Sequence, residues 1–84
     1  MSTTITVRYF AGARAASGIE SETLPVTGPT PLTQLTAQLA ERHGAALTRV
    51  LEASSFLIDE VAGDRSRVVP TGATVDVLPP FAGG

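Results

Sequence analysis

The segment Thr74-Val75-Asp76-Val77-Leu78 decides the fold, and it leads directly into Pro79-Pro80-Phe81-Ala82-Gly83-Gly84. Val75 and Val77 alternate with neighbours on the opposite face, the pattern of a strand that turns one face to the core. Proline fixes φ and lacks an N–H, so Pro79 and Pro80 end the pairing of this strand and extend the chain beyond it. We therefore expect one domain over residues 1–78 and a projecting C-terminal tail over residues 79–84.

The tail has the features of a working part. Gly83 and Gly84 can enter a slot that excludes a Cβ atom, with any backbone angles that the slot imposes. Six extended residues reach at most about 20 Å, which is far enough to place a carboxylate at Gly84 inside another protein. A tail that ends in glycine by chance is the alternative. The combination of strand, Pro-Pro, aromatic residue and Gly-Gly favours a functional tail.

The composition limits the class of protein. Eighty-four residues make one small domain, 43% of them are hydrophobic, and no apolar run approaches a membrane span. The net charge is −2, and arginines and acids are scattered singly, so nucleic-acid binding is not expected. Residues 1–4 have no basic or apolar segment of a secretion signal. With no cysteine in the chain, a cytoplasmic protein is the default expectation.

The chain also has few side chains that could catalyse a reaction. It contains no cysteine, no lysine, and His43 as its one histidine. A self-sufficient enzyme and a metal site are therefore not expected, and His43 is expected to be solvated in the last turn of a helix. Any chemistry would come from partners that act on the tail.

Periodicity predicts five strands, at residues 5–10, 19–26, 55–59, 68–69 and 73–78, with residues 68–69 as a short edge strand. Residues 11–18 are expected to form a loop or a short helical turn, residues 45–53 a short helix or an irregular segment, and residues 61–67 a polar turn region.

One main helix is expected between the second and third strands. Thr30 is the expected N-cap and Pro31 the first helical residue, while Gly44 ends the helix. Three- and four-residue spacing predicts that this helix buries one stripe of leucines, namely Leu32, Leu35 and Leu39.

Three segments resemble the MoaD/ThiS family of sulfur carriers: Val7-Arg8-Tyr9-Phe10-Ala11, residues 71–78, and the tail from Pro79 to Gly84. The length also matches that family end to end, and Pro79-Pro80-Phe81 leans toward its molybdopterin branch. The resemblance implies an α+β, ubiquitin-like β-grasp fold, with a mixed sheet of about five strands packed on one main helix. The predicted order of elements agrees, and the first and last strands would be parallel neighbours at the sheet centre.

The resemblance also implies a chemistry for the tail. Gly84 would be adenylated by a MoeB-like enzyme, which uses ATP and Mg²⁺, and then converted to a thiocarboxylate. The chain itself would bind no cofactor or metal. The sulfur would be delivered inside a MoaE-like large subunit of molybdopterin synthase. The tail residues inserted into that subunit would be Pro79, Pro80, Phe81, Ala82 and Gly83. The complex is expected to be a heterotetramer.

Strand parity places Phe10 and Leu78 together on the sheet face away from the helix. An aromatic residue and a leucine at the base of the tail form a candidate docking patch, although they could instead pack beneath residues 11–18 or the tail.

Other function classes stay open. The chain could carry sulfur for thiamine or cysteine synthesis, act as a ubiquitin-like protein modifier, or be a non-covalent β-grasp binding module.

Overall fold

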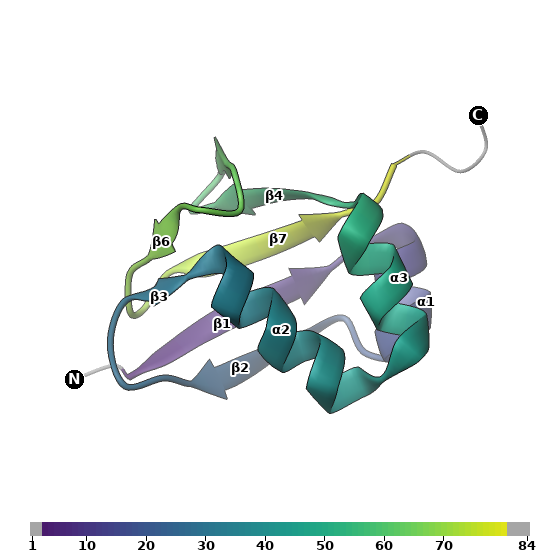
Figure 1. Cartoon of the computed structure of the whole chain (residues 1–84), viewed down its shortest axis with the longest axis horizontal. Coiled ribbons are helices and arrows are strands. Elements are labelled where there is room, and N and C mark those ends of the chain that lie inside the picture. The colour runs from purple at the N-terminus through teal and green to yellow at the C-terminus, as the bar shows by residue number, and fades with distance from the viewer. Residues whose placement is uncertain (1–2, 81–84) are drawn as a thin grey trace.

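A five-stranded sheet forms the centre of the computed structural model, which describes residues 3–80 (Figure 1). Its strands are β1 (Thr4–Tyr9), β2 (Ser21–Pro25), β4 (Ser55–Ile58), β5 (Val61–Gly63) and β7 (Thr74–Leu78), in the order β2-β1-β7-β4-β5. β1 and β7 run parallel at the centre, and the other neighbouring pairs are antiparallel. The mixed sheet with parallel first and last strands confirms the expected β-grasp arrangement.

Three helices accompany the sheet within residues 3–80: α1 (Ala11–Ser17), α2 (Leu32–His43) and α3 (Ala45–Ala53). Figure 1 shows α2 lying across one face of the sheet, with α1 and α3 near the end at which β1 and β7 stop. The segments at 11–18 and 45–53, for which the sequence left a helix and a less regular form open, are thus both helical. None of the helices in the described part is long and apolar enough to cross a membrane.

The core lies between α2 and the sheet. The predicted leucine stripe of α2 is fully buried, and so are the inward-facing residues of β1 and β7, which alternate with residues on the other face. Burial of such side chains contributes about 1.5–3 kcal/mol each, so this layer holds the sheet and α2 together. The buried side chains at its centre are Ile5, Val7, Leu32, Leu35, Leu39, Val75 and Val77.

The start of α2 differs from the prediction. Thr30 does not cap the helix: it is buried in the two-residue strand β3 (Thr30–Pro31), and its hydroxyl donates to the carbonyl of Gly28. The helix begins at Leu32, one residue later than expected. The first helical N–H groups, those of Leu32 and Thr33, donate instead to the backbone carbonyls of residues 67 and 65. A neighbouring loop therefore supplies the acceptors that a capping side chain would otherwise provide.

The region after β4 also differs. Residues 61–67 do not form only a polar turn, because Val61–Gly63 pairs with β4 through a two-residue connection, Asp59-Glu60, in which both residues have positive φ. Such turns usually carry glycine or asparagine, so Asp59-Glu60 is no hairpin signal in a sequence. β6 (Val68–Val69) is not an edge strand of the main sheet either. It pairs with β3 in a separate two-stranded ribbon.

Candidate functional site

The tail leaves from the middle of the sheet. β7 lies between β1 and β4, Val77 just before its end is fully buried, and Leu78 is paired with Ser55 of β4. Pro79 and Pro80 therefore start from a point that two neighbouring strands hold in place. The remaining predicted tail residues, Phe81, Ala82, Gly83 and Gly84, lie outside the described residues. Their roles, and the predicted division of the chain after residue 78, stay predictions.

An ion pair joins the two central strands on the sheet face away from α2. Arg8 of β1 donates from Nε and Nη2 to the two carboxylate oxygens of Asp76 of β7, at 2.6 and 2.8 Å. Asp76 is only 4% exposed, and its hydrogen bond raises the pKa of the Arg8 guanidinium. Two parallel charge-assisted bonds fix both the distance and the angle between partners. The centre of this face is thus polar.

An open, mostly apolar groove of about 620 Å³ lies beside the point where the tail leaves the sheet. Phe10, which is 40% exposed, and Leu78 both line it, so the structure does bring the two predicted docking residues together. The remaining lining comes from the start of α1, from α3 and from the two prolines: Ala11, Gly12, Arg49, Val50, Ala53, Pro79 and Pro80.

Strand parity placed this patch on the sheet face away from α2, and the Arg8 guanidinium of that face does lie 5.7 Å from the centroid of the Phe10 ring. Phe10 follows the last residue of β1 and precedes α1, so it sits at the end of the sheet, where α3 forms one wall of the groove. The ion pair of Arg8 and Asp76 lies next to Phe10 on the face away from α2, so the apolar patch occupies only the end of that face. Sequence reasoning missed the contribution of α3. The sequence signal for this wall is Val50, an apolar residue at helical spacing from Leu47. In the structure Leu47 is buried, whereas Val50 is only partly buried.

His43 is not solvated as predicted. Its side chain is 15% exposed, lies edge-on to the Tyr9 ring, and shares a hydrogen bond with Glu22 of β2. The same carboxylate accepts a hydrogen bond from the Tyr9 hydroxyl and pairs with Arg42 at 2.8 Å. We call Tyr9, Glu22, Arg42 and His43 the Glu22 cluster. It fastens the C-terminal end of α2 to the edge strand β2.

The contacts within this cluster, and the pKa shifts that they cause, favour a structural role. Burial, together with the hydrogen bond to Glu22, raises the pKa of the Tyr9 phenol far above its ordinary value, so this hydroxyl is no nucleophile near neutral pH. Burial alone would raise the pKa of the Glu22 carboxyl, but the hydrogen bonds from Tyr9 and His43 outweigh it and the pKa is lowered. The Glu22 carboxylate already binds Tyr9, His43 and Arg42, so it has little free hydrogen-bonding capacity for a ligand.

No group of three His, Asp or Glu side chains within residues 3–80 has the arrangement of a metal site. The feature of the described chain best suited to a partner is therefore the fixed exit of the tail with the apolar groove beside it.

Comparisons with known proteins agree with this geometry. The model of the ThiS family matches residues 7–84. No curated protein sequence matches the chain. Among solved structures, SAMP1 from Haloferax volcanii superposes with a TM-score of 0.83 at 20% identity, covering 96% of this chain and 99% of its own. Urm1 from Trypanosoma brucei gives a TM-score of 0.76 at 20% identity, with coverage of 99% and 97%.

A third similar structure is the complex of subunits 1 and 2 of the molybdopterin-converting factor from Helicobacter pylori, with a TM-score of 0.68, 22% identity, and coverage of 96% of this chain and 99% of that one. These likenesses support the ubiquitin-like β-grasp fold, and the family match spans nearly the whole chain, including the tail. The chain therefore belongs to the ThiS family.

Proposed function

We propose that this protein carries sulfur as a thiocarboxylate on Gly84 and donates it for the synthesis of molybdopterin, as the small subunit of a molybdopterin synthase. One observation carries the proposal: the Pro-Pro-Phe-Ala-Gly-Gly segment follows a strand that is held at the centre of the sheet, beside an apolar groove. A fixed exit and a narrow, side-chain-free end suit a terminus that works inside other proteins.

The chemistry begins with a poor acyl donor. An oxygen of the Gly84 carboxylate attacks the α-phosphorus of ATP in an adenylating partner, and pyrophosphate leaves. Sulfide, or an equivalent sulfur donor, then attacks the carbonyl carbon of the acyl adenylate, and AMP leaves. The thiocarboxylate that remains is ionised near neutral pH and is a good nucleophile. This chain contributes the carboxylate and the geometry, while the partner supplies ATP, Mg²⁺ and the sulfur-handling cysteine.

Two partners follow from this scheme. A MoeB-like enzyme would adenylate Gly84, and a MoaE-like large subunit would receive residues 79–84 and use the sulfur, in a heterotetramer located in the cytoplasm. The similar Helicobacter pylori structure, a complex of subunits 1 and 2, supports a large-subunit partner. Inside that subunit a basic side chain would hold the thiocarboxylate by charge-assisted hydrogen bonds.

Phe10 and Leu78 would contact these partners. Both line the groove at the base of the tail, and Phe10 is the larger exposed side chain there. Interfaces concentrate their binding energy in a few aromatic and apolar anchors that become buried, and these two residues would be such anchors. Docking at the groove would then aim the tail into the partner's active site.

A protein modifier is the second candidate function, because SAMP1 from Haloferax volcanii, the small archaeal modifier protein 1, superposes with a higher TM-score than the Helicobacter pylori complex does. A modifier would form an amide between Gly84 and an amine of a target through the same adenylate. Since the chain has no lysine, its own side chains offer no amine for such a bond. Sulfur carriers for thiamine or cysteine synthesis use the same tail chemistry and are further alternatives.

A deletion strain separates these functions. Loss of molybdoenzyme activity, without a requirement for thiamine or cysteine, is the expected result. A requirement for thiamine or cysteine with active molybdoenzymes would assign the protein to a sister pathway. Lysine-linked conjugates that contain this chain and disappear in the deletion strain, with molybdoenzymes intact, would make it a modifier.

A further inference from the structure

We propose that the tail rests against its own domain in the free protein, with Phe81 in the apolar groove and the carboxylate of Gly84 paired with Arg49, until a partner takes the groove. The contact itself can be tested on the isolated chain. Its consequence for sulfur transfer rests on the proposed function.

The first observation is the groove itself. It is mostly apolar, about 620 Å³ in volume, and open to solvent, with Phe10 40% exposed on one side and Val50 and Ala53 of α3 on the other. A contiguous apolar surface of this kind gains free energy when an apolar group covers it. Within residues 3–80 no side chain covers it.

The second observation is the position of the next aromatic residue. Pro79 and Pro80 line the groove, so residue 81 begins at its edge, and residue 81 is a phenylalanine. No long excursion of the chain is needed to place this ring on Phe10 or Val50. Because the loop to be closed is only one or two residues long, the entropic cost of bringing Phe81 to the groove is small.

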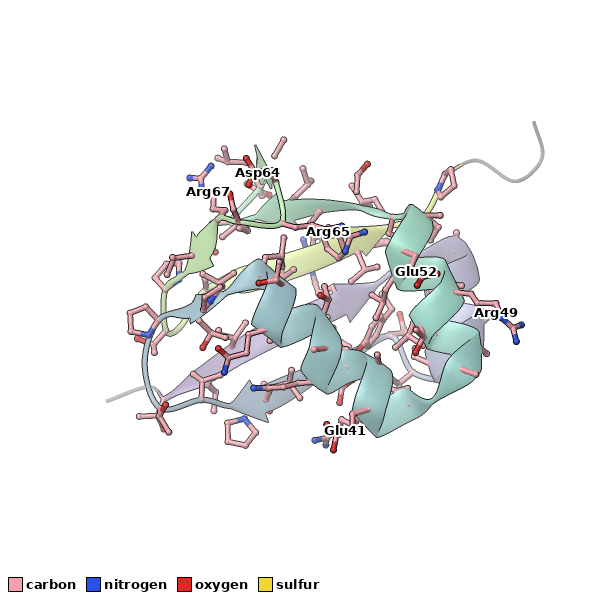
Figure 2. All side chains as sticks on the ribbon, in the orientation of Figure 1. Glu41, Arg49, Glu52, Asp64, Arg65 and Arg67 are labelled. Atoms are coloured by element: carbon pink, nitrogen blue, oxygen red, sulfur yellow. The ribbon has the colours of Figure 1, made fainter. Side chains whose placement is uncertain are left out.

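The third observation is the charge at the groove. Arg49 is its one charged lining residue, and Figure 2 shows Arg49 extending from α3. Each of the other five arginines has a hydrogen-bond or ion-pair partner within residues 3–80, whereas the Arg49 side chain has none there. Four residues after Pro80 reach at most about 14 Å, so a carboxylate at Gly84 can come to a guanidinium on the groove rim.

The balance of free energies makes this contact easy to displace. Covering an aromatic ring is favourable, but ordering residues 81–84 costs backbone entropy of similar size. An exposed pair between Arg49 and a carboxylate adds little. The bound and released tail would therefore be comparably populated, and a partner that binds Phe10 and Leu78 would shift the population to the released form.

The contact would thus couple docking to exposure of the reactive end. The groove that holds Phe81 is also lined by Phe10 and Leu78, so a partner and the tail compete for one surface. A partner that occupies the groove releases Gly84, whereas a protein that does not bind there meets the terminus less often. The tail would thus be released from the groove when a partner docks, next to the protein that acts on Gly84.

Methyl NMR of the isolated chain tests the position of Phe81. A ring in the groove shifts the methyl signals of Val50 and Ala53, so Phe81→Ala should move both signals toward those of a chain truncated after Pro80. Val68→Ala, at an exposed position far from the groove lining, is the matched control and should leave them unchanged. Unchanged Val50 and Ala53 signals in Phe81→Ala would overturn the proposal.

The amide signal of Gly84 tests the charge pair. This amide signal should move in Arg49→Gln and in high salt. It should not move in the control Arg14→Gln, which changes an exposed arginine of α1 that pairs with Glu20. The same Gly84 shift in wild type and Arg49→Gln would remove Arg49 from the proposal. If the Val50 signal depends on protein concentration, the occupant is the tail of a second copy, which also overturns it. Both experiments need no partner, so they stand apart from any failure of thiolation.

Discussion

Replacing Glu22 by alanine should destabilise the domain strongly for a residue so close to the surface. The Glu22 side chain is 9% exposed and accepts hydrogen bonds from the Tyr9 hydroxyl and from His43, and it pairs with Arg42. Tyr9 is 2% exposed, so in Glu22→Ala its hydroxyl loses its carboxylate partner in a site that water scarcely reaches. That loss costs about 1–3 kcal/mol.

The pair of Glu22 with Arg42 contributes less. Arg42 is 53% exposed and can be hydrated again, so its pair is worth about 0–1 kcal/mol. We therefore expect a loss of about 2–3 kcal/mol in the free energy of unfolding, a large share of the roughly 4–13 kcal/mol typical of a domain of this size. With an m-value near 1 kcal/mol/M for a small domain, the urea midpoint should fall by about 2–3 M.

A double-mutant cycle gives the decisive reading. Tyr9→Phe alone should cost about 1 kcal/mol, because it removes one buried hydrogen bond. In the Glu22→Ala background the same change should be close to neutral, since it removes a hydroxyl that has already lost its partner. Equal costs of Tyr9→Phe in both backgrounds, or a cost below about 0.5 kcal/mol for Glu22→Ala, would refute the role assigned to this cluster.

Three further predictions follow from the same geometry. The pKa of Glu22 is lowered in the folded chain, so the contribution of Glu22 to stability is present at a pH above the ordinary pKa and should disappear as the pH falls through the lowered pKa. Urea midpoints measured at decreasing pH should show this loss in wild type and not in Glu22→Gln. Identical acid profiles of the two proteins would contradict the prediction. Phe10→Asp or Leu78→Asp should weaken binding to a partner by about 1–3 kcal/mol in calorimetry with little change in thermal stability, whereas large destabilisation with unchanged affinity would place these side chains in the core. Gly83→Val should block sulfur transfer in a reconstituted synthase while docking survives, because a branched side chain would clash in a narrow channel, and transfer at the wild-type rate would show that no such channel exists.

The sequence predicted the fold where short-range patterns decide it. The leucines at positions 32, 35 and 39 lie at helical spacing, and residues 74–78 alternate, so α2 and β7 could be found without a structure. The two prolines after Leu78 marked the end of the last strand in the same way.

The errors arose where distant residues decide the outcome. Thr30 had the residue type of a cap, but a loop more than thirty residues away supplies the acceptors for the first turn of α2. His43 was expected in solvent because its partner, Glu22, lies 21 residues earlier and meets it only when α2 packs on β2. The groove was incomplete for the same reason: the wall that α3 adds depends on how three helices and two strand ends pack, which periodicity does not report.

Intact-mass spectrometry tests the central claim most directly. After incubation with its adenylating enzyme, ATP and a sulfur source, the chain should gain about 16 Da, the replacement of one oxygen by sulfur at the terminal carboxylate. A variant that lacks Gly84, and another with one residue added after it, should fold normally and gain nothing. Thiolation of the extended variant to the same extent as wild type, or no gain by the wild type under conditions that thiolate a known carrier, would contradict the account.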